Sequence, residues 1–343
     1  MRLNDILEIS RIEELTKDLP ESGFKLNKIH CSDSEILDLG IPGSLTAITM
    51  DTIVEEVESG LYTDPFQIGW MVVVANLSDL AAVGAQPMGM LLSHTIPESW
   101  NDDQIKGLVN GVRSSSGSHG CPIIGGDLNL GSPSFTGVGI GSVDKESLMS
   151  RVGCSKGDLI YTTAPPGLGT AYAVSELVLK GRLGDLEYFP KARLKEGGLI
   201  SKYATSCMDT SDGLISALDH LARINNISID LNSDIPLNND CNKIKEYLGL
   251  PPLTFTFGIH GDFELVYTIP KKLEKQFLLD SNKHGYDPLK IGSCLGDIGQ
   301  NGIFCNDALL PSEKIRNLWD ISDSMEEYAF ELITLVGEIF IDD

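Results

Sequence analysis

Residues 71–87 read MVVVANLSDLAAVGAQP, a stretch of apolar and small residues that carries Asn76, Ser78 and Asp79 in its middle. An Asp-Pro pair at 64–65 precedes it, which is typical of a helix cap followed by proline at the first helical position. The apolar residues then follow a helical period, so the pattern predicts a buried helix. Burying the carboxylate of Asp79 is costly unless it is hydrogen-bonded, paired or bound to a metal. The stretch therefore also predicts a functional site.

Strands and helices are predicted to alternate on both sides of this helix, after a leading helix within residues 1–24. Residues 46–50 (TAITM) are β-branched and indicate a strand that ends at Asp51. Residues 121–124 (CPII) are expected to form a buried strand. The alternation indicates an α/β or α+β protein. Further strands are expected at 89–97, 134–143, 158–163, 227–231, 263–270 and 290–296, and helices at 101–115, 167–181, 211–226 and 271–282.

The length and one polar segment predict the domain organisation. A chain of 343 residues is too long for one simple core, so two domains are expected. The polar, glycine-containing turn SRVGCSKGD at 150–158 is the expected boundary. We therefore expect an N-terminal domain at 1–149, a C-terminal α/β domain at 150–322 and a tail at 323–343. The tail is interrupted by glutamates, so we interpret it as a packing or partner-binding element and not as a membrane anchor.

The charge and the cysteines exclude several classes of protein. A net charge of -23 repels phosphate backbones, which argues against a nucleic-acid partner. The seven cysteines are scattered and form no CxxC pair, which predicts reduced thiols in a cytoplasm and argues against a zinc site. The N-terminus lacks the apolar region of a secretory signal, and no apolar stretch is long enough to span a membrane. We expect a cytoplasmic protein with a small-molecule substrate.

Six aspartates share one context, since each follows an apolar stretch and lies beside small or hydroxyl residues. Loops at strand ends are common places for functional sites, and carboxylate oxygens are ligands that Mg²⁺ prefers. For any single aspartate a helix cap or an Asx-turn is the more frequent role. Six in matching contexts favour a shared cation site. They are Asp33 in CSDSEIL, Asp51 in TMDTIV, Asp79 in NLSDLAA, Asp127 in IIGGDLN, and Asp209 and Asp212 in MDTSDGL.

Other nucleotide and catalytic motifs are weak or missing. Gly125 and Gly126 before Asp127 would let the backbone approach a phosphate closely, although GGD alone is a weak signal. The sequence has no GxxxxGK[ST], no GxSxG and no HExxH. The histidines form no metal-ligand spacing, and each is expected to be structural or exposed.

Six segments follow one another in an order that resembles the thiamine-monophosphate kinase family. This family belongs to the aminoimidazole ribonucleotide synthetase-like superfamily, together with selenophosphate synthetase and a hydrogenase-maturation protein. The string NLSDLAAVGA is specific, and MDTSDGL with GDFEL favours the kinase branch. The segments lie roughly within residues 31–300 and read TMDTIVE, NLSDLAAVGAQPMGMLLS, IIGGDLN, SRVGCSKGDLIYTT, MDTSDGL and GDFELVYTIP.

The resemblance implies a two-domain fold, a homodimer and an ATP site. The sheet of the N-terminal α/β domain would pair with that of a second copy, and ATP would lie in a cleft beneath the C-terminal domain. Asp127 and Arg151 would be catalytic, and the acceptor would contact positions 58, 261 and 319, here Glu58, Gly261 and Trp319. The implied metal ligands are Asp33, Thr49, Asp51, Asp79, Asp127, Asp209 and Asp212, and the implied ATP contacts are Gly125, Gly126, Asp127, Arg151 and Ser211.

The implied reaction is direct in-line transfer of the γ-phosphoryl group of ATP to the phosphate of thiamine monophosphate. Joining two phosphate groups brings negative charges together, so the reaction needs Mg²⁺ and Arg151 for charge neutralisation. It needs no nucleophilic serine, cysteine or histidine.

Departures from the family pattern cluster on the acceptor side. Glu58 stands at a substrate-contacting histidine position, and Gly261 stands at an acidic position. Leu128 and Asn129 replace two hydroxyl residues, and Met50 replaces a third. Two explanations remain open. One is divergence within the thiamine-monophosphate kinases, and the other is a superfamily paralogue that uses ATP to phosphorylate or activate another small acceptor, as in cyclo-ligation.

Overall fold

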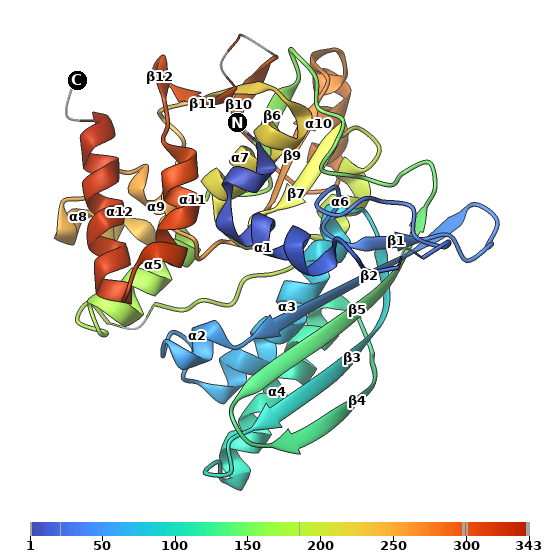
Figure 1. The fold of residues 1–343 in the computed structure, drawn as a ribbon, viewed down its shortest axis with the longest axis vertical. Coiled ribbons are helices and arrows are strands. Elements are labelled where there is room, and N and C mark those ends of the chain that lie inside the picture. The colour runs from blue at the N-terminus through green and yellow to red at the C-terminus, as the bar shows by residue number, and fades with distance from the viewer. Residues whose placement is uncertain (1, 21, 185, 297–298, 300, 341–343) are drawn as a thin grey trace.

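The protein is described here by a computed structural model, which covers residues 2–20, 22–184, 186–296, 299 and 301–340. The first sheet lies in the lower part of Figure 1 and takes all its strands from the first half of the chain. Its strand order is β1-β2-β5-β3-β4, and only β3 and β4 run parallel. The strands are β1 (Glu35–Leu37), β2 (Ser44–Ile53), β3 (Gln86–Ile96), β4 (Ile123–Leu130) and β5 (Ser134–Asp144).

The second sheet lies in the upper part of Figure 1 and is built from the second half of the chain. Its strand order is β12-β11-β8-β10-β6-β9-β7, and β11 pairs with β8 in parallel. The strands are β6 (Leu159–Thr162), β7 (Ser206–Asp209), β8 (Ser228–Leu231), β9 (Leu265–Ile269), β10 (Leu289–Gly296), β11 (Gly302–Cys305) and β12 (Ala308–Leu309).

The helices are distributed over both halves of the chain. In the first half they are η1 (Leu3–Asp5), α1 (Leu7–Thr16), α2 (Glu55–Glu58), α3 (Pro65–Ala82) and α4 (Asp102–His119). In the second half they are α5 (Leu168–Ala173), η2 (Val174–Val178), α6 (Leu194–Ile200), α7 (Leu214–Asn225), α8 (Cys241–Leu248), α9 (Thr254–Phe257), η3 (Lys271–Leu273), α10 (Glu274–Lys283), α11 (Ser312–Ile321) and α12 (Met325–Phe340). Among the described residues, no helix combines the length and apolar composition needed to cross a membrane.

Helix α3 is the predicted buried helix, and it lies between the two sheets. The Asp64 side chain accepts a hydrogen bond of 3.0 Å from the backbone N–H of Phe66, which confirms the predicted cap. The helix packs on the first sheet on one side and contacts β7, β9 and α6 on the other. Glycines in β5 permit the close approach, because a Cβ on Gly137 would lie 2.4 Å from Nδ2 of Asn76. Residues near the C-terminal half of α3 thus face both halves of the molecule.

The N-terminal segment packs on the second half of the chain, where α1 contacts α11. Arg223 of α7, whose side chain is fully buried, donates to Asp219 at 2.7 Å and to the backbone oxygen of Arg2 at 2.6 Å. Arg316 of α11 donates to the same Asp219 at 3.1 Å. These charged hydrogen bonds tie the chain start and α11 to α7.

Two predictions about individual elements differ from the structure, the first in burial and the second in length and helix type. Strand β4 begins at Ile123 and is exposed along its whole length, not buried as its apolar residues suggested. It is the edge strand of its sheet, and no described element covers its outer face. The helix expected at 167–181 is instead a short α-helix followed by a π-helical turn, η2. The fold class agrees with the mixed α/β prediction.

Candidate active site

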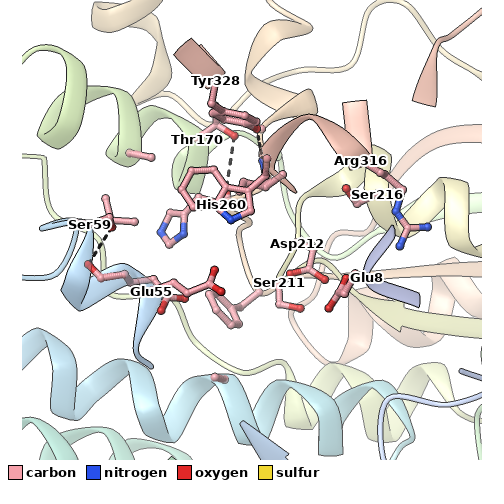
Figure 2. Close-up of a pocket in the computed structure, with 18 of the residues that line it drawn as sticks. Glu8, Glu55, Ser59, Thr170, Ser211, Asp212, Ser216, His260, Arg316 and Tyr328 are labelled. Carbon is pink, nitrogen blue, oxygen red and sulfur yellow. Dashed lines mark hydrogen bonds between the residues drawn. The ribbon is translucent and has the colours of Figure 1, made fainter. Parts of the chain in front are cut away.

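A cavity of about 900 Å³ lies between the two sheets and reaches α12. One end is lined by carboxylates from the loop before β1, from β2, from α3 and from the turn after β7. Figure 2 shows Asp212, Glu8 and Arg316 on one side, with His260 and Tyr328 beyond Ser211. We call the carboxylate-lined part the acidic end.

Three carboxylates meet at the acidic end. Asp33, Asp79 and Asp209 each offer an oxygen atom, and these atoms all lie within 4.8 Å of one another. The Oδ2 atoms of Asp33 and Asp209 are buried and have no hydrogen-bond partner among the described residues. Buried carboxylate oxygens that face one another without donors indicate a place for a cation.

The polypeptide around Asp33 holds its other oxygen in place. Arg151 donates to Oδ1 of Asp33 at 2.9 Å, and the backbone N–H of Asp209 donates to the same atom at 3.4 Å. The backbone N–H of Arg151 donates to the carbonyl of Cys31 at 2.9 Å, which joins the two loops. The side chain of Asn225 donates to the carbonyl of Arg151 at 2.8 Å. The Asp33–Arg151 pair is therefore a fixed part of the acidic end.

Strand β2 and helix α3 place the other ligand candidates. The Thr49 hydroxyl of β2 donates a hydrogen bond to Oδ2 of Asp79. The side chain of Asn76 accepts from the backbone N–H of Asp51 at 3.2 Å and donates to the carbonyl of Val72 at 2.9 Å. After β7, the Ser211 hydroxyl donates to Oδ1 of Asp209 at 2.9 Å. The polar residues in the middle of 71–87 thus connect β2 to the carboxylate cluster.

The raised pKa values of the buried aspartates indicate a site that favours a bound cation. Burial raises the pKa of Asp209 to about 7, and the nearby Asp33 adds to the shift. Burial raises the pKa of Asp51 to about 6, with contributions from Asp212 and Asp33. The pKa of Asp79 lies well above its usual value because of burial and the neighbouring aspartates. Burial disfavours the charge of Arg151, but Asp33 holds its pKa above the ordinary value. The carboxylates that line this end outnumber the arginines that line it, so the end has an excess of negative charge.

The donor set fits magnesium. Closely spaced carboxylate oxygens, a threonine hydroxyl and a wide cavity for a phosphate group are the environment in which Mg²⁺ is usually held. Among the residues that the structure describes, the convergent group consists of three aspartates and includes no cysteine or histidine. The described residues therefore match a hard divalent cation better than zinc.

The structure brings most of the sequence-predicted site residues to this cavity. The exceptions on the nucleotide side are Gly125, Gly126 and Asp127 of β4, where Asp127 accepts a hydrogen bond of 2.9 Å from Asn129. The strand register places Gly126 three strands away from Asp51, which corresponds to about 14 Å. The predicted residues that line the cavity are Asp33, Thr49, Asp51, Asp79, Arg151, Asp209, Ser211, Asp212 and Trp319.

Glu58 and Gly261 are not among the described residues that line the cavity. Around position 58 the lining comes from Glu55, Glu56 and Ser59 instead. A Cβ on Gly261 would lie 1.7 Å from the carbonyl oxygen of Thr210, so close packing explains why this position has no side chain. The oxygen of Gly261 accepts from the Tyr188 hydroxyl at 2.5 Å.

The sequence did not single out several residues that face the cavity. Glu8 comes from α1, and burial together with Asp212 raises its pKa. Arg316 comes from α11 and faces the same part of the cavity in Figure 2. His260 shares a hydrogen bond of 3.1 Å with the Tyr62 hydroxyl, and burial lowers its pKa to about 4. For Glu8 and Arg316 the only available signal was a charged residue within an amphipathic helix, which is not specific, and for His260, in a loop, there was none.

Comparisons with known proteins agree with the geometry. The family described as AIR synthase related protein, N-terminal domain, matches residues 32–143. A thiamine-monophosphate kinase of Buchnera aphidicola from Acyrthosiphon pisum is 31% identical over 278 residues, which is 76% of this chain and 85% of the relative. That of Pyrococcus horikoshii is 31% identical over 232 residues, 66% of this chain and 72% of the relative.

A solved structure shares the fold over nearly the whole chain. It is described as AaThiL complexed with AMPPCP and TMP, and it superimposes with a TM-score of 0.74 at 24% identity. The match covers 91% of this chain and 97% of that one. The second half of the chain, which the matched domain family does not reach, thus has the same arrangement.

Proposed function

This chain belongs to the thiamine-monophosphate kinase family, and we propose that it transfers the γ-phosphoryl group of ATP to thiamine monophosphate to make thiamine diphosphate. The observation that carries the proposal is the convergence of Asp33, Asp79 and Asp209, with two buried oxygens lacking partners, in one cavity with Arg151. Such a site can hold cations and phosphate groups, and it presents no activated nucleophile.

Magnesium fits the acidic end as the companion of ATP. The residues that would hold it are Asp33, Asp79 and Asp209, with Thr49, Asp51 and Asp212 at the same end of the cavity. When bound, Mg²⁺ supplies positive charge that neutralises phosphate oxygens. The protein contributes by fixing the ligands before the substrates arrive. The Thr49 hydroxyl holds Asp79, and the Asn76 side chain holds the backbone of Asp51 near the end of β2.

Arg151 is the proposed catalytic cation supplied by the protein. One of its nitrogens is occupied by Asp33, whereas its buried Nε has no partner among the described residues. This N–H can donate to a phosphate oxygen without breaking the ion pair. Because Asp33 fixes the guanidinium, Arg151 stabilises the charge of the transferred group with little reorganisation. Ser211, which lines the same end, is a proposed ATP contact.

We propose that two copies pair through the first sheet and that the pairing matters for the ATP site. Strand β4 is an edge strand whose exposed apolar side chains include Ile124, Leu128 and Leu130. Edges of this kind pair readily with another chain. The proposed ATP contacts Gly125, Gly126 and Asp127 lie on this strand, and a second copy would place them at an interface. The measurement is the mass of the protein in solution by light scattering.

We propose that the two domains, each built around one of the two sheets, have different roles. Residues 1–149 would bind metal and ATP and form the dimer, and residues 150–322 would complete the cavity. Trp319 lines the cavity and remains the proposed acceptor contact from α11. Glu58 and Gly261 stay proposed acceptor contacts. Neither lines the cavity, but their chain neighbours Ser59 and His260 do.

The test is a reconstituted reaction followed by chromatography of the thiamine compounds. Purified protein with Mg-ATP and thiamine monophosphate should release ADP and thiamine diphosphate in equal amounts. The reaction should stop when a chelator removes the divalent cation. If no thiamine diphosphate forms with any of Mg²⁺, Mn²⁺ or Co²⁺, the proposed reaction is wrong.

A further inference from the structure

The segment 188–193, which leads into α6, belongs to the second half of the chain but lies against helices of the first half. Figure 1 shows it as a yellow-green coil that runs from near α5 toward α6. The Trp70 indole of α3 donates to the carbonyl of Pro190 at 2.7 Å. The backbone N–H of Ala192 donates to Nε2 of His119 on α4 at 3.1 Å. We call residues 188–193 the crossing segment, and these hydrogen bonds fix it to α3 and α4.

Helix α6, which follows the crossing segment directly, is also fixed to α3. A Cβ on Gly197 of α6 would lie 2.4 Å from the carbonyl oxygen of Ala81. The two helices therefore pack closely beside the part of α3 that carries Asp79. Arg193 stands between the crossing segment and α6, so the chain on both sides of it is held against the first half.

The Arg193 side chain forms a two-point ion pair with Glu264. Its Nε donates to Oε2 of Glu264 at 2.7 Å, and its Nη2 donates to Oε1. The Thr163 hydroxyl donates to the same Oε2. The Glu264 side chain is only 11% exposed, so these donors take the place of water around its carboxylate. A two-point pair fixes the orientation of the carboxylate as well as its distance from the arginine.

The backbone of Glu264 in turn holds the turn that follows β7. The backbone N–H of Thr210 donates to the carbonyl of Glu264 at 2.8 Å, and the N–H of Glu264 donates to the Thr210 hydroxyl at 3.1 Å. The N–H of Asp262 donates to the carbonyl of Thr210 at 3.2 Å. Thr210 directly follows Asp209, one of the three convergent carboxylates. The place of Glu264 therefore fixes the start of the turn that carries Asp209.

We propose that Arg193 is a positioning residue that acts through Glu264 to hold Asp209 at the correct distance from the carboxylate of α3. By doing so, it sets the affinity of the acidic end for divalent cations. Neither Arg193 nor Glu264 is among the described residues that line the cavity, so neither is proposed as a ligand or a substrate contact. This inference rests on the proposed function, because the cation is the one proposed to accompany ATP.

The acidic end needs such a connection because its carboxylates come from separate parts of the fold. Asp79 belongs to α3 of the first half, whereas Asp209 ends a strand of the second sheet. Like charges repel, so the cluster tends to open when no cation is bound. Mg²⁺ requires nearly ideal octahedral geometry, so a small displacement of one ligand lowers its affinity. Residues that orient metal ligands commonly change metal affinity by about 10-fold to 100-fold when they are replaced.

A matched pair of substitutions tests the proposal. Glu274 also accepts hydrogen bonds from a hydroxyl and a cation, from Tyr161 at 2.7 Å and from Lys290 at 3.3 Å, but it does not line the cavity. Arg193→Gln and Lys290→Gln thus each remove the cation from such a carboxylate. Mn²⁺, which prefers the same oxygen ligands as Mg²⁺, is titrated into the full chain, and the electron paramagnetic resonance signal reports the unbound ion.

Arg193→Gln should weaken Mn²⁺ binding by about tenfold, whereas Lys290→Gln should change it by less than about twofold. Arg193→Lys keeps the charge and should recover part of the affinity. The activity of Arg193→Gln should need more Mg²⁺, but its kcat at saturating Mg²⁺ should stay within about threefold of the unchanged protein. A purely structural ion pair would lower the thermal midpoint without changing the Mn²⁺ affinity. An unchanged Mn²⁺ affinity in Arg193→Gln, or an equal loss in Lys290→Gln, would overturn the proposal.

A second variant covers the case in which Arg193→Gln does not fold. Glu264→Gln removes the ion pair without leaving a nearly buried carboxylate unpaired, and it keeps an oxygen for the Thr163 hydroxyl. It should weaken Mn²⁺ binding in the same direction by a smaller factor. An Mn²⁺ affinity equal to that of the unchanged protein would overturn the proposal here as well.

Mn²⁺ binding is measured without substrates, so the inference and the proposed function can fail separately. If Arg193→Gln weakens Mn²⁺ binding but the unchanged protein makes no thiamine diphosphate, the reaction is wrong and the positioning role stands. If the unchanged protein makes thiamine diphosphate but Arg193→Gln binds Mn²⁺ equally well, the positioning role is wrong and the reaction stands.

Discussion

The two ends of the cavity are built in opposite ways. At the acidic end, short loops and one central helix hold Asp33, Asp79 and Asp209 close together, and hydrogen bonds fix their orientation. The other end of the cavity, which we call the apolar chamber, is lined by uncharged side chains from η2, α9 and α12, among them Val174, Leu177, Phe255, Ala329 and Leu332. The first arrangement is costly to maintain without a cation, whereas the second is stable when empty.

The difference shows where binding energy and selectivity arise. The acidic end concentrates charge that only a cation and phosphate groups can offset, so it serves the step common to any acceptor. The side chains of the chamber can change without disturbing those charges. Substitutions at the two ends should therefore have effects of different size and kind.

The largest effect is expected for Asp79→Asn at the acidic end. The asparagine keeps the shape of the side chain but removes one of the three convergent charges, so turnover should fall by about 100-fold to 1,000-fold. The thermal midpoint of the metal-free protein should stay the same or rise, since a buried carboxylate among other carboxylates is unfavourable. Steady-state kinetics and calorimetric unfolding measure the two results.

The control for this substitution is Asp103→Asn in α4. Its side chain is 91% exposed and forms a surface ion pair with Lys106, so activity and stability should both stay near those of the unchanged protein. Full activity in Asp79→Asn would show that α3 contributes no essential group to the site. A large loss of stability together with activity would mean that Asp79 is structural.

The acidic end was largely predictable from the sequence, and the chamber was not. Asp51 and Asp79 stand at a predicted strand end and on a predicted buried helix, which are local patterns that the sequence shows directly. Thr49 was predicted only through the resemblance to the family. The chamber joins segments near residues 174, 255 and 329, which are far apart in the chain. Their amphipathic patterns predict helices but not which helices meet. The exposure of β4 was missed because apolar residues on an edge strand resemble those of a buried one.

A smaller effect is expected in the pH dependence of the free energy of unfolding, to which the carboxylates of the acidic end contribute and the uncharged chamber does not. The folded-state pKa values of Asp209 and Asp51 are raised to about 7 and about 6 by burial and neighbouring carboxylates. A raised carboxyl pKa contributes stability that is complete below the unfolded value near 4 and is lost as the pH rises through the folded value. The metal-free protein should therefore lose on the order of a few kcal/mol between pH 4 and 7.5.

The comparison that isolates this effect is the same titration with Mg²⁺ and an ATP analogue. Bound cations offset the carboxylate charges, so the difference in stability between the two conditions should grow with pH. Other buried groups, such as His260 and Asp262, contribute equally to both titrations. Denaturant unfolding at each pH gives the values. A constant difference across the range would show that the cluster does not bind the cation.

Tyr328→Phe should have a modest effect confined to the chamber entrance, which Tyr328 forms with the loop at 259–260. The substitution removes the acceptor of the hydrogen bond from the Ile259 N–H but keeps the ring against Trp319. A lost hydrogen bond of this kind costs about 1 kcal/mol of stability, and a less fixed 259–260 loop should raise the acceptor KM by about threefold. The turnover number and the KM for ATP should not change. An equal loss in both KM values would contradict a role limited to the entrance.

The smallest effect is expected for His260→Gln. Burial lowers the pKa of His260 to about 4, so the imidazole is neutral throughout the working range and shares its hydrogen bond with Tyr62 in that state. Glutamine can make a similar hydrogen bond without a titratable group. The profiles of kcat/KM against pH from 6 to 9 should therefore have the same shape, with values within about threefold of each other. A step above pH 5 that is present with histidine and absent with glutamine would make His260 a proton donor or acceptor, and the chamber entrance would then take part in the chemistry of the acidic end.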